Sequence, residues 1–377
     1  MFSRLYLHIP WCLNKCGYCA FSSRQGAALD LERTSTLLIR EMELSPDSTG
    51  PLASIYFGGG TPSLLTPPQV AALLNAAQKR WGLQTDAEIT LEANPGTVTR
   101  EKLTGFRAAG INRLSLGVQS FHDATLQLLD RIHTAEEARS ALHEARLAGF
   151  DNIGIDLICG LPQQTLQTWQ ADLKEAIRLA PQHLSVYSLS IEDGTPFAER
   201  YPEDSPALPD DDLTATLMET AEQLLCAAGY EHYEIANYAR PGFRSRHNSG
   251  YWQRDGYLGL GPAAHSMLVN GWGERFSNPY DERRWCERIE AGTTAWEERH
   301  ELSAEEALAE EFFLGLRMAD GIAPAELLQR YGSTLWKRHA DTLADLLGHG
   351  LLQRSDERLS LTSRGMLLAN RIFVRFI

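Results

Sequence analysis

The feature of this sequence that most constrains its fold is a regular alternation of short apolar runs and amphipathic stretches through the first half of its 377 residues. The apolar runs span residues 5–9, 54–57, 88–92, 113–118, 152–158 and 183–189, and they are apolar on both faces, as buried parallel strands are. Stretches with helical spacing of apolar residues follow them, for example 67–81, 100–109, 135–148 and 166–179. Because eight such units close a barrel and only six are evident, we predict an α/β fold built on a partial (β/α)6 barrel with a wide lateral mouth.

Polar residues stand at or just beyond the carboxyl ends of the predicted strands, where barrels place their ligand sites. They are His8, the glycines after Phe57, Glu92, Gln119, Asp156 and Ser190. Glu92 and Asp156 lie amid apolar strand residues, where an unpaired charge is costly, so we disfavour a surface role for either. We therefore expect a ligand site at this edge of the sheet.

The second half of the chain predicts two further regions. Residues 201–212 read as an exposed loop before a helix that ends near residue 228, and residues 238–278 lose the alternation, which predicts an irregular lid over the barrel mouth. Helical patterns at 304–318, 324–331 and 335–348 precede two β-like runs at 351–354 and 358–362. We predict a barrel domain over 1–235, a lid segment over 236–300, and a C-terminal helical, winged-helix-like domain over 301–377, which can equally be described as a helical cap on the barrel.

Charge and hydropathy narrow the class of protein. A formal net charge of −14 argues against a nucleic-acid binder, because phosphate binding needs a clustered cationic surface. No apolar run approaches the roughly 18 residues of a membrane helix, so we expect a cytoplasmic protein. The basic, apolar end at 371–377 is compatible with peripheral membrane contact, although we favour a docked terminal helix.

Three cysteines follow directly after the first predicted strand. Cys12, Cys16 and Cys19 are separated by three and two residues, a spacing that lets one loop wrap three corners of an iron–sulfur cubane. Residues 1–29 carry no acidic side chain, which favours thiolates and an anionic cluster. The spacing alone leaves three alternatives open: zinc with His8 as fourth ligand, a redox pair of Cys16 and Cys19, and chance clustering of buried cysteines.

The cysteine spacing, with the aromatic residue Tyr18 before the third cysteine, resembles the defining motif of the radical-SAM superfamily. The GGGTP run of Gly58–Pro62 after the second strand resembles that superfamily's glycine motif, and glycines let a ligand approach the backbone closely. The resemblance implies a 4Fe–4S cluster on Cys12, Cys16 and Cys19, with S-adenosylmethionine (SAM) bound at the iron that these thiolates leave free.

Within the superfamily, the chain resembles the HemN-like group over nearly its whole length. The resemblance is carried by LYLHIPWC, YFGGGTPS, LEANPGTV, GVQSF, IDLICGLPQQT and GLGPAAHS. The implied SAM contacts are Tyr6, Tyr18, Gly59, Gly60, Thr61, Pro62, Glu92, Gln119, Arg131, Asp156 and Ser190, with His265 as a further candidate.

The HemN-like group includes oxygen-independent coproporphyrinogen III oxidase and heme chaperones of the HemW type. The oxidase has a further cysteine where this chain has Phe21, and it carries a longer segment before its cluster. The predicted lid instead reproduces the HNxxYW motif of the chaperones as His247, Asn248, Tyr251 and Trp252. An imidazole can ligate heme iron and aromatic rings can stack on a porphyrin, although a hydrogen-bonded histidine and lid-anchoring aromatics give the same pattern.

Nearby arginines add to this interpretation, because guanidinium groups can pair with the two heme propionates. The candidates are Arg240, Arg244, Arg246 and Arg254.

The resemblance implies a heme chaperone that binds heme and passes it to apo-hemoproteins of respiration, without coproporphyrinogen III oxidase activity. Its implied partners are heme, these apoproteins and an electron donor, with a homodimer left open as the oligomeric state. Two rivals remain: a radical enzyme of the oxidase type, and an iron–sulfur scaffold without SAM chemistry. The second leaves the GGGTP run and the polar strand ends unexplained.

Overall fold

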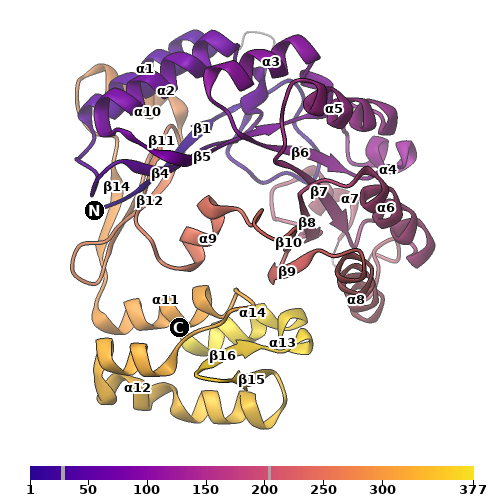
Figure 1. Cartoon of the computed structure of the whole chain (residues 1–377), viewed down its shortest axis with the longest axis vertical. Helices are drawn as coiled ribbons and strands as arrows, with labels where there is room; N and C mark the ends of the chain where they lie inside the picture. The colour runs from indigo at the N-terminus through magenta and orange to yellow at the C-terminus, as the bar shows by residue number, and fades with distance from the viewer. Residues whose placement is uncertain (27–29, 203–204) are drawn as a thin grey trace.

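The computed structural model describes residues 1–26, 30–202 and 205–377. The six predicted strands are all present: β1 (Arg4–Ile9), β4 (Leu52–Gly59), β5 (Leu83–Ala93), β6 (Arg113–Gln119), β7 (Ile153–Cys159) and β8 (His183–Ser188). They lie side by side in this order, all parallel, and curve into an open barrel (Figure 1). The α/β fold with a partial barrel is thus confirmed.

Helices cover the convex face of this sheet (Figure 1). They are α1 (Leu31–Leu44), α2 (Pro67–Trp81), α3 (Arg100–Ala109), α4 (Asp123–Leu128), α5 (Ala135–Leu147), α6 (Leu166–Leu179) and α8 (Asp211–Ala227), with the short α7 (Pro196–Arg200) before α8. Thr66, Thr134 and Thr165 fix the starts of α2, α5 and α6, because each side chain accepts a hydrogen bond from a backbone N–H of the first turn. The predicted loop at 201–212 includes residues 203 and 204, which lie outside the described residues.

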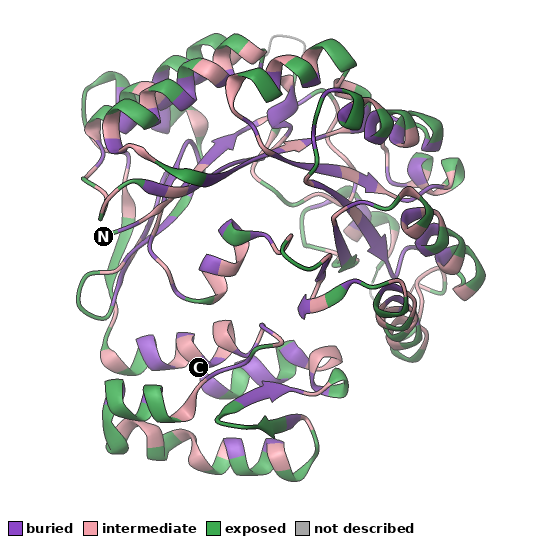
Figure 2. Ribbon diagram, viewed as in Figure 1, coloured by how far each residue is buried: buried purple, intermediate pink, exposed green. Residues whose placement is uncertain are grey.

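The parallel strands differ from the sequence prediction in the character of their inner face. In the strand register, Ile55 pairs with Ile89 and Phe57 with Leu91, and these residues pack in the buried core. The alternate positions carry polar groups instead, such as Ser54 opposite Glu88 and Glu92 opposite Ser115. The strands are therefore apolar toward the helices and polar toward the barrel interior, because successive side chains point to opposite faces. Figure 2 shows that these strands are mostly buried or half-buried.

The segment predicted as an irregular lid is more regular than its sequence suggested. The strands β11 (Tyr257–Leu260), β12 (His265–Leu268), β13 (Glu274–Ser277) and β14 (Glu297–Glu301) extend the sheet beyond β1, and the helix α10 (Glu282–Glu290) packs beside α1. At the other edge, β10 (Asn237–Ala239) and β9 (Glu231–Glu234) continue from β8. Strands of three to five residues are too short to show a clear period in the sequence.

The helix α9 (Arg246–Trp252) lies inside the concave side of the sheet (Figure 1). The backbone N–H groups of Arg246 and His247 donate to the Glu88 carboxylate of β5, at 3.0 and 2.8 Å. This carboxylate binds the exposed donors at the start of the helix and fixes α9 to the barrel wall. The HNxxYW motif is therefore part of the barrel interior.

The C-terminal residues form helices around a hydrophobic cluster of their own. These elements are α11 (Ala304–Gly315), α12 (Pro324–Gly348), the hairpin of β15 (Leu352–Ser355) and β16 (Arg358–Leu361), α13 (Ser363–Leu367) and α14 (Ala369–Phe373). A kink at Gly332, where φ is 83°, separates the two helices predicted within α12. The C-terminal helical domain is confirmed, and the boundaries at 235 and 300 stay predictions. Among the described residues, no helix has both the length and the apolar character needed to cross a membrane.

Candidate functional site

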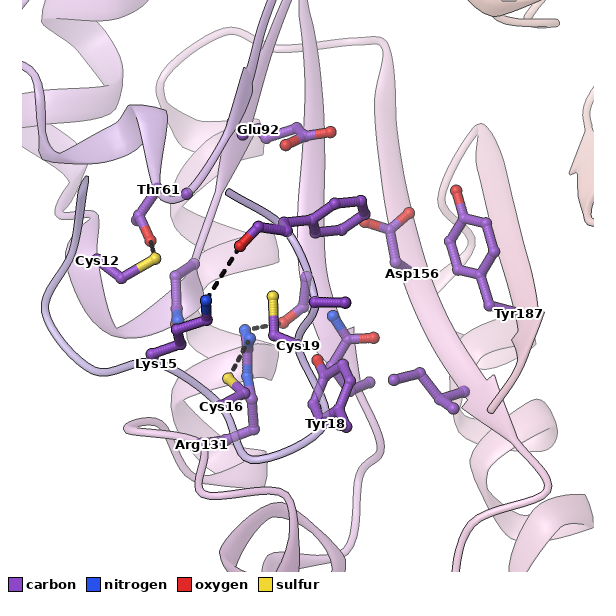
Figure 3. Close-up of a pocket in the computed structure, with 18 of the residues that line it drawn as sticks. Cys12, Lys15, Cys16, Tyr18, Cys19, Thr61, Glu92, Arg131, Asp156 and Tyr187 are labelled. Atoms are coloured by element: carbon purple, nitrogen blue, oxygen red, sulfur yellow. Dashed lines mark hydrogen bonds between the residues drawn. The ribbon is translucent and has the colours of Figure 1, made fainter. Parts of the chain in front are cut away.

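A cavity of about 500 Å³ opens at the carboxyl edge of the parallel strands. Its walls come from the loop after β1, the ends of β4 to β8 and the residues that follow them, as Figure 3 shows for the labelled side chains. The predicted contacts that line it are Cys12, Cys16, Tyr18, Cys19, Gly59, Gly60, Thr61, Pro62, Glu92, Gln119, Arg131, Asp156 and Ser190. The fold therefore gathers residues that are spread over most of the barrel sequence.

The cysteine loop is held against the glycine motif by its backbone. The N–H of Gly60 donates to Ile9 O at 2.8 Å, and the N–H of Thr61 donates to Trp11 O at 2.8 Å. The Thr61 hydroxyl also reaches Cys12 Sγ at 3.5 Å (Figure 3). Cys12 follows Trp11 directly, so the glycine motif sets the position of the first thiol.

The geometry of the three thiols bears on which group they hold. In the described residues, no three His, Cys, Asp or Glu side chains converge on one point as single-ion ligands do. In a 4Fe–4S cubane each cysteine binds a different iron, so the three sulfur atoms surround the cluster and need not point at a single atom. His8, the fourth ligand of the zinc alternative, donates from Nε2 to Ser22 O at 2.7 Å and accepts at Nδ1 from the Tyr6 hydroxyl at 3.1 Å. Its nitrogens are therefore engaged elsewhere, and the site fits a cluster better than zinc.

Positive charge surrounds the thiols. Arg131 donates from Nη1 to Cys16 Sγ at 3.4 Å and from Nη2 to Gly117 O at 2.6 Å, while its buried Nε has no hydrogen-bond partner among the described residues. Lys15 lies at the cavity wall, with its Nζ on the Phe21 carbonyl at 3.1 Å (Figure 3). Burial raises the pKa of Cys19, and Lys15 opposes that shift. The unpaired Arg131 Nε–H supplies a donor for an anionic ligand group beside the thiols.

Two carboxylates face the cavity from β5 and β7, the strands on either side of β6. Burial raises the pKa of Glu92 to about 7, although the hydroxyl of Tyr56, which donates at 2.7 Å, lowers it. Burial likewise raises the pKa of Asp156, which accepts from the Ser115 hydroxyl at 3.3 Å. A cationic amino group or ribose hydroxyls at this position would replace the lost hydration of these carboxylates. The donor set therefore fits the amino acid and ribose portions of SAM.

Two of the predicted SAM contacts lie outside the cavity. Tyr6 lies beneath the glycine motif, since a Cβ on Gly58 would stand 2.8 Å from its ring. His265 is exposed at the start of β12 and does not reach the cavity wall. The contact of His265 with SAM stays a prediction, since His265 begins β12 and is not among the residues that line the cavity.

Several cavity residues were missed by the sequence reasoning. They are Asn14, Lys15, Ala20, Phe21, Ala93, Asn94, Ser115, Gly117, Ile158, Tyr187, Ser188, Leu189 and Glu192. Most lie within two residues of a predicted residue, in the cysteine loop or near a strand end, so that position in the sequence was the available signal. Gln119 shows why strand ends matter: its φ of 69° is left-handed, a conformation that persists at functional sites when the surroundings fix it.

The HNxxYW motif lies away from this cavity. His247 is fully buried, and its ring hydrogen bonds with the Ser54 hydroxyl at 2.8 Å and the Tyr251 hydroxyl at 2.7 Å. Its ring packs 5.1 Å from that of Tyr56, the residue that binds Glu92. With both nitrogens engaged, the imidazole has no free site for heme iron unless α9 leaves the barrel. The heme contacts of His247, Asn248, Tyr251 and Trp252 stay a prediction that needs such a movement.

The four arginines near the motif differ in their availability. Arg254 is buried against Glu310 at 2.8 Å, which leaves it unavailable to a propionate. Arg240 packs over the Tyr230 ring at 4.0 Å and donates to the Ala228 carbonyl oxygen. Arg244 and Arg246 are partly exposed and line a second, smaller cavity.

We expect Gly60→Ala to disrupt the cluster loop. A Cβ on Gly60 would lie 2.6 Å from the Trp11 carbonyl oxygen, a backbone atom directly before Cys12, so the loop must move. Iron and sulfide bound per chain after anaerobic reconstitution should fall by half or more. Gly348→Ala is the matched control, since nothing lies within 4 Å of its added methyl group. Full iron content in Gly60→Ala would show that the glycine motif does not position Cys12.

We expect His247→Ala to lower stability and, if α9 stays inside the barrel, to leave heme coordination unchanged. The change leaves a cavity and removes the partners of two buried hydroxyls, which together cost about 3 kcal/mol or more of the free energy of unfolding. Denaturant unfolding measures the first effect, and the Soret band of the heme complex measures the second. His143→Ala, on the exposed face of α5, is the control. A shifted Soret band in a variant of normal stability would instead make His247 a ligand.

Comparison with known proteins shows the family to which the chain belongs. Residues 6–176 match the radical SAM superfamily and residues 302–368 match the HemN C-terminal domain. The heme chaperone HemW of Haemophilus influenzae is 44% identical over 283 residues, covering 72% of this chain and 73% of that protein. The heme chaperone HemW of Bacillus subtilis is 34% identical over 375 residues, covering 99% of this chain and 98% of that protein.

Among solved structures, coproporphyrinogen III oxidase (HemN) from Escherichia coli superposes with a TM-score of 0.86 at 24% identity, over 100% of this chain and 90% of that chain. At this identity, the match shows a common fold. The two HemW proteins share a higher sequence identity with this chain than the oxidase does, so they define its group within the superfamily more narrowly. The chain belongs to the radical SAM superfamily and, within its HemN-like group, to the family of proteins named heme chaperone HemW.

Proposed function

We propose that this protein is a heme chaperone that binds heme, transfers it to apo-hemoproteins of respiration, and carries a 4Fe–4S cluster with bound SAM. The observation that carries the proposal is the cavity at the carboxyl edge, where three thiols, a buried arginine and two carboxylates face one space. The similarity to proteins named heme chaperone HemW supports heme as the cargo.

Each group in the cavity has a role in this proposal. Cys12, Cys16 and Cys19 would hold three corners of the cluster, which supplies one-electron chemistry when bound. Glu92 and Asp156 would accept from the amino group and the ribose hydroxyls of SAM. Arg131 would donate its unpaired Nε–H to the carboxylate and balance the charge of the cluster. The glycines of the GGGTP run leave the backbone open to the ligand.

The rival proposal is a radical enzyme that decarboxylates coproporphyrinogen III. This chain shares its fold with the Escherichia coli oxidase, so the fold does not distinguish the chaperone proposal from the oxidase proposal. Phe21 occupies the position of the oxidase's additional cysteine, and its side chain is 71% exposed at the cavity wall. An exposed phenyl group cannot replace a thiol as donor or ligand, which favours the chaperone.

A side-by-side anaerobic assay tests the proposal. The reconstituted protein should bind heme and donate it to the apo form of a b-type cytochrome at a rate that rises with acceptor concentration, as direct transfer requires. With SAM and a reductant, coproporphyrinogen III should stay intact at the level of a no-protein blank, while the Escherichia coli oxidase serves as positive control. Substantial turnover of coproporphyrinogen III would favour the oxidase proposal over the chaperone proposal. A transfer rate that does not depend on acceptor concentration would show passive release of heme in place of direct transfer.

A further inference from the structure

A second cavity, of about 290 Å³, lies at the opposite end of the barrel from the cluster loop. We call it the arginine cavity; its lining residues are Arg4, Ala53, Ser54, Gln84, Arg244, Arg246, Ser249 and Gln253. Arg4 begins β1, while Ala53 and Gln84 are the second residues of β4 and β5. The arginine cavity thus lies at the amino edge of the parallel strands. It shares no lining residue with the cavity at the carboxyl edge that holds the three cysteines.

The lining of the arginine cavity is cationic in an acidic protein. It contains three guanidinium groups, two amides and two hydroxyls, but no carboxylate, although the whole chain carries 49 acidic and 35 basic residues. Acids outside the lining hold each arginine: Asp255 holds Arg4 at 2.8 Å and Asp86 holds Arg246 at 2.8 Å. Arg244 is held by two, Asp320 at 2.8 Å and Glu231 at 3.3 Å, which contact Nη1 and Nε and leave Nη2 without an ion pair in the part of the chain that the structure describes. A guanidinium has five N–H donors, so one carboxylate leaves donors for a second anion.

These ion pairs also hold the arginines in place before any ligand arrives. The Arg246 Nη2 donates to Ala53 O at 3.2 Å and to Asp86 O at 2.7 Å, and the Arg4 side chain is only 13% exposed. Groups fixed in this way lose little side-chain entropy on binding. The arrangement is typical of a site for planar or tetrahedral oxyanions, which arginine binds through two parallel hydrogen bonds.

We propose that the arginine cavity binds the oxyanion group of a small ligand, either a carboxylate or a phosphate. Its volume equals roughly ten water molecules at the volume per water in the liquid, so it accepts the anionic group of a ligand and leaves a larger body outside. Two ligands could supply such a group. The first is heme, through its propionates, and this assignment rests on the proposed function. The second is free phosphate or a phosphate ester, and this assignment does not rest on it.

The first arm of the test uses inorganic phosphate, titrated calorimetrically at constant ionic strength into the full-length protein. Wild-type protein should bind it saturably. Arg246→Gln and Gln84→Glu should each weaken binding tenfold or more, the first by removing donors and the second by placing a carboxylate in the lining. Gln84 is exposed, so its variant does not disturb the core. Arg283→Gln and Gln167→Glu, exposed positions on α10 and α6, are the matched charge controls.

The second arm compares heme with heme dimethyl ester, which has the same ring and no free carboxylate. If the propionates occupy the cavity, Gln84→Glu weakens heme binding tenfold and leaves ester binding unchanged. Saturable phosphate binding, with heme and its ester affected equally or not at all by Gln84→Glu, assigns the cavity to phosphate ligands. The proposal is overturned if phosphate does not saturate and Gln84→Glu matches Gln167→Glu with both porphyrins. If wild-type protein does not bind heme, only the chaperone proposal is contradicted, because the phosphate titration tests the arginine cavity without heme.

Discussion

Replacing Cys12, Cys16 and Cys19 together with serine is expected to abolish cluster assembly. Serine hydroxyls do not provide the thiolate ligands that hold iron–sulfur clusters, and no other cysteine lines the cavity. Iron and sulfide should fall from about four of each per chain to background, and the broad visible absorption of the reconstituted protein should disappear. Chemical iron and sulfide analysis with absorption spectroscopy measures both.

A control separates cluster loss from general damage. Cys226 is exposed on α8, outside the cavity, so Cys226→Ser should keep full iron and sulfide. The circular dichroism spectrum of the triple variant should also match that of wild-type apoprotein, because the loop contributes little regular structure. Iron and sulfide that persist in the triple variant would show that the cluster is bound elsewhere.

Replacing Glu92 with glutamine is expected to have opposite effects on SAM affinity and on apoprotein stability. The pKa of Glu92 is raised to about 7 by burial, whereas an unfolded glutamate titrates near 4.5. The folded state therefore favours the protonated carboxyl, and wild-type stability falls as pH rises from the unfolded pKa through the folded one. At pH 8 the buried charge costs roughly 3 kcal/mol, a cost that glutamine removes. At low pH the two proteins should differ little.

The affinity effect has the opposite sign because the charge is useful once SAM is bound. A hydrogen bond from the cationic amino group to a carboxylate is worth about 1.5–3 kcal/mol, so Glu92→Gln should weaken SAM binding roughly 10- to 100-fold. Calorimetry measures the affinity, and denaturant unfolding at pH 5 and pH 8 measures the stability. Glu101→Gln, exposed on α3, is the control. A variant that binds SAM as tightly as wild-type would remove Glu92 from the site.

The fold and much of the cavity could be predicted because the signals are local. The helix over 67–81 begins and ends where the spacing of its apolar residues predicts, and the strand ends of β4 to β7 carry the polar side chains that meet at one edge. Cys12, Cys16 and Cys19 occupy one loop, so their proximity follows from chain connectivity. These features do not depend on distant contacts.

The features that were not predicted depend on contacts between distant parts of the chain. The place of α9 inside the barrel rests on Glu88 of β5, more than half the barrel sequence away, and the residues around His247 show no strong helical period. To predict the polar inner face, one must know that Ser54 and Glu88 lie on the same side of the sheet. His265 was placed by resemblance to a motif, and its outward direction depends on its pairing with β13. In each case tertiary packing decides what local pattern leaves open.

The most direct test is metal analysis and electron paramagnetic resonance of the reduced wild-type protein, prepared without oxygen, before and after SAM is added. If the three thiols leave one iron open, the protein should hold about four irons and four sulfides. Its reduced-cluster signal should also change shape and position at saturating SAM, and the triple serine variant should show no signal. Stoichiometric zinc, an absence of bound metal, or a cluster signal that saturating SAM leaves unchanged would contradict the account.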